Sequence, residues 1–144
     1  MRKLIYIIKD YLLFVNLIKN FTGDIVNETL TFDEKFDALG EFYNIESPSE
    51  IRQQIKKNEN IFVFLEEVKS LLNKSFHEAQ FCLKMNFEPE MDDKYIILWV
   101  NVPLNHFHNG ARNDLNKIQK QLFTLRHQIN VHRECLIMLG VLNV

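Results

Sequence analysis

The stretch of sequence that decides the fold is residues 79–104, AQFCLKMNFEPEMDDKYIILWVNVPL. Its first half alternates apolar and polar residues with a period of two, which places one face of a strand on a core and the other in water. Its second half is apolar on both faces, which indicates a strand covered on both sides near Ile97 and Trp99. The acidic turn between the halves contains Pro89 and no glycine, so a loop longer than two residues is favoured.

Helical patterns precede and follow this pair of strands. Thr31 and Glu34 have the spacing of a capping box, and Ser47 followed by proline has the pattern of a second helix start. An apolar stripe over residues 60–74 predicts a longer helix that covers the strands. Residues 111–129 repeat apolar positions at spacings of three and four, which predicts another helix packed on the sheet.

The last apolar run has the length of a buried strand, so it should join the sheet. We therefore predict an α+β fold of two layers, with an antiparallel sheet of at least three strands covered by helices and an appended N-terminal helix. The three strands are residues 79–87, 94–103 and 134–142. The whole chain, residues 1–144, is predicted to be a single domain, with an N-terminal helix at 1–22 and an α+β core at 31–144.

Composition limits the classes of function. The chain has 144 residues, of which 47% are hydrophobic, and this is enough for one core. A formal charge of -2 gives no global field that would attract nucleic acid or an anionic membrane. Cys82 and Cys135 lie inside apolar runs without metal-type spacing, which predicts reduced thiols and a cytoplasmic protein.

The N-terminal segment is the main reason to expect a protein partner. Lys9 and Asp10 interrupt its apolar run, so no membrane span is expected. As a helix it has more apolar surface than one core contact requires. This surface predicts a homodimer or the binding of another protein, and Trp99 is a further candidate anchor on the sheet. The candidate partner-binding residues are Ile5, Tyr6, Leu12, Leu13, Leu17 and Trp99.

Three short segments carry a family resemblance: LGEFYNIESPSEI at residues 39–51, FLEE at 64–67 and EPE at 88–90. Together they resemble a group of small uncharacterised bacterial proteins with an LGxFYxIxSPEEI segment. In that group the segment is followed by a helix, a strand ending in Asp-Pro-Glu, a second strand, a helix and a last short strand. This chain departs from the group in two places. It has Glu88 where the group has Asp, and it has Leu122-Phe123 where the group has an Asp/Glu-Trp-Trp feature late in its helix. The resemblance implies an order of elements and no activity.

One third of the chain holds most of the residues that could carry catalysis. His106 and His108 have a spacing that presents two imidazoles on one side of an extended segment, but no cysteine or carboxylate with zinc-site spacing accompanies them. With Arg112 and His127 they could supply an acid and a phosphate clamp, as in small ribonucleases. Solvated histidines are the simpler interpretation.

The acidic turn is a candidate cation site. Glu88, Glu90, Asp92 and Asp93 could bind a divalent cation, yet the twelve-residue calcium pattern and its glycine are absent. A solvated loop is therefore favoured. The chain has four scattered glycines and no phosphate-binding glycine loop, so no cofactor is expected.

The functional prediction is a non-enzymatic protein interaction or regulatory module that forms a homodimer or binds another protein, with nucleic acid disfavoured as a partner. The alternative from a different class is a small metal-independent nuclease or hydrolase that uses the histidine and arginine set. A third hypothesis is an operon-encoded partner of a toxin–antitoxin or defence system.

Overall fold

The computed structural model of the chain describes residues 30–142. These residues fall in two compact units that divide between Ala38 and Leu39. The predicted N-terminal helix at residues 1–22 lies outside the described residues. No helix within the described range is long and apolar enough to cross a membrane. The elements, in chain order, are α2 (Phe32–Phe42), β1 (Asn44–Ile45), α3 (Pro48–Lys57), α4 (Asn60–Ser75), β2 (Gln80–Glu88), the 3-10 turn η1 (Pro89–Met91), β3 (Asp93–Val102), α5 (Leu104–His108), α6 (Ala111–Ile129) and β4 (Cys135–Val141).

The four strands form one mixed sheet in the order β1-β2-β3-β4. β2 and β3 are antiparallel, as predicted, but β1 pairs with β2 in parallel and β4 pairs with β3 in parallel. The prediction of an antiparallel sheet of three strands is therefore wrong for β4. The reason is the connection: the 19-residue α6 returns the chain to the end of the sheet where β3 begins, as a crossover between parallel strands requires.

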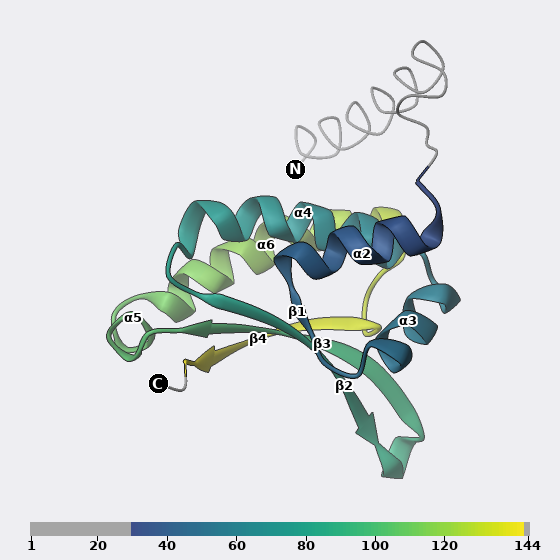
Figure 1. The fold of residues 1–144 in the computed structure, drawn as a ribbon. Coiled ribbons are helices and arrows are strands. Elements are labelled where there is room, and N and C mark those ends of the chain that lie inside the picture. Colours follow the sequence, from purple (N-terminus) through teal and green to yellow (C-terminus); the bar gives the residue numbers. More distant parts are fainter. Residues whose placement is uncertain (1–29, 143–144) are drawn as a thin grey trace. The chain divides into compact units, whose positions relative to one another are not determined.

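α4 and α6 cover one face of this sheet (Figure 1). The strands contribute Leu83, Ile96, Leu98 and Val100 to the core, and each of these side chains is fully buried. Burial of this apolar surface is the dominant favourable term in folding, so the layer between helices and sheet holds residues 39–142 together. The helices contribute Leu65, Val68 and Leu72 from α4 and Leu115, Ile118 and Leu122 from α6.

Two local predictions have different outcomes. The capping box at α2 is confirmed, because the Glu34 N–H donates to Thr31 Oγ1 over 3.2 Å. Ser47 precedes α3 as predicted, but it adopts φ 51 and makes no capping hydrogen bond with its side chain. Between β3 and α6 the chain forms a further short helix, α5.

Candidate functional site

The alternation of side chains along the strands separates two faces of the sheet. From Ile96 onward, the residues of even number on β3 are buried on the side of α4 and α6, and those of odd number point to the other side. We call this other side the open face, because no layer like that of α4 and α6 covers it among residues 39–142 (Figure 1). The strand pairing assigns to it Asn44, Gln80, Cys82, Lys84, Asn86, Tyr95, Ile97, Trp99, Asn101, Leu136, Met138 and Gly140.

The open face has an apolar half and a polar half. Trp99 lies between Cys82 on β2 and Met138 on β4, and Ile97 lies between Lys84 and Leu136. The β3–β4 half is thus lined by large apolar side chains, whereas the β1–β2 half carries amides and a lysine. Met138 is 44% exposed and Trp99 is half-buried. The sequence pattern predicts that β3 is covered on both sides here, but residues 39–142 cover only the even-numbered side.

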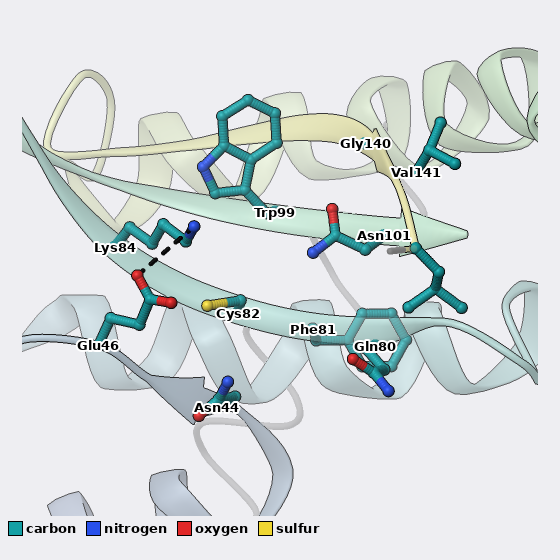
Figure 2. Close-up of a pocket in the computed structure, with 11 residues that line it drawn as sticks. Asn44, Glu46, Gln80, Phe81, Cys82, Lys84, Trp99, Asn101, Gly140 and Val141 are labelled. Atoms are coloured by element: carbon teal, nitrogen blue, oxygen red, sulfur yellow. Dashed lines mark ion pairs between the residues drawn. The ribbon is translucent and has the colours of Figure 1, made fainter. Parts of the chain in front are cut away.

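A hollow of about 420 Å³ lies on this face beside Trp99 (Figure 2). Gly140 shapes it: a Cβ at this position would overlap the side-chain oxygen of Asn101 and would lie 3.3 Å from Trp99 Cε3. The absence of a side chain on β4 therefore lets both β3 side chains lie across the neighbouring strand.

Carboxamides provide most of the polar lining of the hollow. The side chains of Asn44, Gln80 and Asn101 make no hydrogen bond to another group within residues 30–142. Each carboxamide offers both a donor and an acceptor. These three side chains can therefore bind polar groups of a partner in either role.

Carboxylates neutralise the cations beside the open face. Lys84 Nζ lies 3.5 Å from Glu46 Oε2 (Figure 2). Arg133 lies 3.6 Å from Glu88 and 3.4 Å from Asp93. These pairs leave no concentration of positive charge of the kind that a phosphate backbone requires.

A polar network closes the hairpin end of the open face. Tyr95 donates a hydrogen bond of 2.7 Å to Glu88 Oε1, and Asn86 Nδ2 donates to the Tyr95 hydroxyl over 2.7 Å. The hydrogen bond to Glu88 is the main cause that raises the pKa of Tyr95, and burial adds to it.

Both cysteines are free and buried, as predicted. Burial, followed by the charge of Glu46, raises the pKa of the Cys82 thiol, and burial raises the pKa of Cys135 to about 12. A thiol with a raised pKa stays protonated near neutral pH and is a poor nucleophile. Cys82 therefore contributes shape to the hollow rather than reactivity.

The histidine and arginine set is divided between the two ends of α6. His106 Nε2 lies 3.1 Å from Asp114 Oδ2, and the His108 ring contacts Phe107. Arg112 and His127 are fifteen residues apart on the same helix, which corresponds to about 22 Å along its axis. The structure does not bring these residues into one cleft.

His127 and His132 form a separate aromatic group with Phe123. Their ring centroids are 5.1 Å apart, and Phe123 packs on His127 at 4.6 Å. Beside them is Arg126, which the sequence analysis did not single out. Its Nη1 donates to the carbonyl groups of Val131, His132 and Cys135, so its role is to hold the chain between α6 and β4.

The candidate cation ligands in the acidic turn lie in two settings. Glu88 and Asp93 pair with Arg133, whereas Glu90 and Asp92 lie on the exposed turn itself. Within residues 30–142 no group of three or more His, Cys, Asp or Glu side chains is arranged to hold a metal ion.

The partner-binding residues proposed from sequence also divide. Trp99 lies on the open face, and Ile5, Tyr6, Leu12, Leu13 and Leu17 fall outside the described residues. The sequence pattern does not reveal Leu136, Met138 and Gly140 as surface residues, because an unbroken apolar run predicts burial on both faces. Only the register with β3 shows that these residues border Trp99.

Comparison of the chain with protein-family models, with curated proteins and with solved structures gives no match.

Proposed function

We propose that the chain is a non-enzymatic protein interaction module and that the open face is its binding surface. The observation that carries the proposal is the apolar half of that face. Trp99 and Ile97 on β3 lie beside Leu136 and Met138 on β4, with no covering layer among residues 39–142. Large apolar side chains gathered on one surface of a protein mark sites of interaction.

The layout of the open face fits a protein partner. Protein interfaces have an apolar centre enriched in aromatic residues and methionine, surrounded by a polar rim with few uncompensated charges. Here Trp99 and Met138 supply the centre, and Asn44, Gln80 and Asn101 supply a rim of carboxamides. Tryptophan is among the residues that contribute most to binding energy when a partner covers them.

The titratable groups also support binding over catalysis. Cys82 has a raised pKa, and Lys84 is paired with Glu46, so neither is prepared to act as a nucleophile or a base near neutral pH. The geometry of the histidine set favours no hydrolytic centre, since Arg112 and His127 lie near opposite ends of α6.

The test uses the full-length chain as bait in extracts of its source, with Trp99→Glu as the altered variant. Lys117→Glu is the matched control, because Lys117 is exposed on α6, away from the open face. We expect the same protein to be captured by the parent and by Lys117→Glu but not by Trp99→Glu. With that partner purified, Trp99→Glu should raise the dissociation constant by about tenfold or more, as expected for a central aromatic anchor.

Far-UV circular dichroism must show that the Trp99→Glu variant is folded. The Trp99 side chain is only partly buried, so a glutamate at this position can reach water. A folded Trp99→Glu variant that binds the captured partner as tightly as the parent would refute the open face as the binding surface.

A further inference from the structure

Strand β4 is an edge of the sheet, with β3 on one side and no strand on the other among residues 39–142. Its ladder with β3 begins where the Ile96 N–H donates to the Glu134 carbonyl and ends where the Leu142 N–H donates to the Val102 carbonyl. In a parallel ladder, alternate residues direct their peptide groups toward the neighbouring strand. The residues whose N–H and C=O groups point to the outer edge are therefore Cys135, Ile137, Leu139 and Val141.

α6 occupies the first half of this outer edge. Arg126 Nη1 donates to the Cys135 carbonyl over 2.9 Å, and Gln119 Nε2 donates to the Ile137 carbonyl over 3.1 Å. No donor within the described residues reaches the carbonyls of Leu139 and Val141. The second half of β4 thus keeps backbone donors and acceptors that can pair with another strand.

This edge also lacks the usual protection against pairing. Edge strands are commonly guarded by charged residues or proline, but β4 reads CLIMLGV and contains neither. Exposed apolar side chains accompany it: Phe123 is 56% exposed, Met138 44% and Val141 36%. Phe123 and Met138 line a hollow of about 400 Å³ between α6 and β4.

We propose that β4 pairs antiparallel with β4 of a second copy of this chain, about a two-fold axis at Gly140. Leu139 then lies opposite Val141 of the partner subunit, and the two residues exchange N–H···O=C bonds in both directions. The two-fold axis repeats this pair of hydrogen bonds between Val141 and Leu139 of the partner subunit. The pairing uses only the outward N–H and C=O groups of Leu139 and Val141. The hydrogen bonds from Arg126 and Gln119 to the first half of β4 stay intact.

Two properties of the edge favour a second copy as its occupant. The strand carries no charge, so antiparallel self-pairing places no like charges opposite each other. Gly140 faces its own counterpart at a position without hydrogen bonds, where Cα atoms approach to about 4.5 Å, and it brings no side chain into that contact. The assembly is a closed dimer with one continuous sheet. It does not depend on the partner proposed for the open face, which remains accessible on the same side of both copies.

The test compares Val141→Pro with Val141→Thr in the full-length chain. The register with β3 directs the Val141 N–H to the outer edge, so proline at this position removes no bond of the β3–β4 ladder and only the bond to the second copy. Gly140 before it has no Cβ to clash with the proline ring. Threonine keeps the N–H and the branched shape. In sedimentation equilibrium we expect the parent and Val141→Thr to be dimers at about 100 μM. Val141→Pro should raise the dissociation constant by about tenfold or more.

Amide hydrogen exchange in the parent provides a second measurement that needs no variant. Raising the protein concentration should slow exchange at Leu139 and Val141 and leave Ile96 unchanged, because Ile96 is already bonded inside the sheet. A parent that is monomeric at about 100 μM would overturn the proposal. So would exchange at Leu139 and Val141 that is independent of concentration. A dimer that Trp99→Glu abolishes and a folded Val141→Pro retains would place the second copy on the open face instead.

Discussion

Gly140 is the residue at which one missing side chain shapes the open face. The Asn101 and Trp99 side chains lie where its Cβ would be, so the hollow depends on glycine through contact rather than through backbone freedom. Gly40 in α2 is a useful contrast, because a Cβ there would meet only Ile45 Cδ1, at 3.8 Å. The two glycines therefore have opposite expected responses to alanine.

We predict that Gly140→Ala lowers the free energy of unfolding by about 1–3 kcal/mol, since Asn101 and Trp99 must move. Gly40→Ala should raise it by about 0.5–1 kcal/mol, because alanine favours the helix and fits the space. Urea unfolding at low protein concentration measures both. Adding Asn101→Ala to Gly140→Ala should recover part of the loss. Equal effects at the two glycines would contradict the contact described at Gly140.

Tyr95 provides a prediction about pH. The folded chain raises the pKa of this phenol, chiefly through the hydrogen bond to Glu88. Because the pKa is higher in the folded state, there is a pH range in which folded Tyr95 keeps its proton and unfolded Tyr95 has lost it. The stabilisation is therefore present below a pH of about 10 and is lost as the pH rises through the folded-state pKa.

Phenolate formation can be followed by absorbance, and subtracting the titration curve of Tyr95→Phe isolates this residue. Tyr95 should ionise at a higher pH than a free tyrosine. Glu88→Gln should bring its titration back toward the ordinary range. A Tyr95 titration that is unaffected by Glu88→Gln would show that another group sets its pKa.

At the scale of elements, Arg126 joins the end of α6 to the start of β4. Its guanidinium lies 4.3 Å from the Phe64 ring centroid and donates to three backbone carbonyls. Burial lowers the pKa of this arginine. Neighbouring Arg133 has a 56% exposed side chain and makes ion pairs on the surface. The two arginines therefore differ in how much structure depends on them.

We predict that Arg126→Leu lowers the free energy of unfolding by about 2–4 kcal/mol, because three backbone carbonyls, two of them in part-buried hydrogen bonds, lose a charged donor. Arg133→Leu should change it by less than about 1 kcal/mol, as is usual for exposed ion pairs. Thermal and urea unfolding of the two variants test this. The role assigned to Arg126 fails if both substitutions have the same small effect.

The elements illustrate what the sequence can predict. The strands at 79–87 and 94–103 and the helices at 60–74 and 111–129 were placed within about two residues, because each has a long periodic pattern. β1 was missed because two residues show no period. The predicted direction of β4 was wrong. Alternation along a strand indicates which face each side chain takes, but it does not indicate whether the neighbouring strand runs parallel or antiparallel.

For residues 39–142 taken together, the proposed function rests on which face of the sheet is left open. Trp99 was singled out from the sequence, but its neighbours Leu136 and Met138 come from a strand 37 to 39 residues further along the chain. Their contact depends on the register between β3 and β4, which no local pattern encodes. The histidines lie at separate ends of α6 for a different reason, since the 19-residue helix stands between His108 and His132.

The most direct test of the open face uses Trp99 itself, the single tryptophan of the chain. Its fluorescence in the full-length protein reports on that face without any label. We predict that acrylamide quenches the fluorescence of Trp99 in the folded chain, with an efficiency reduced from that of the urea-unfolded chain because the side chain is half-buried. The β4-paired dimer should not alter this, because it forms through the backbone groups of β4 and leaves the open face accessible on the same side of both copies. A blue-shifted emission that resists acrylamide would mean that the face is covered in the free protein, and would contradict its role as a binding surface.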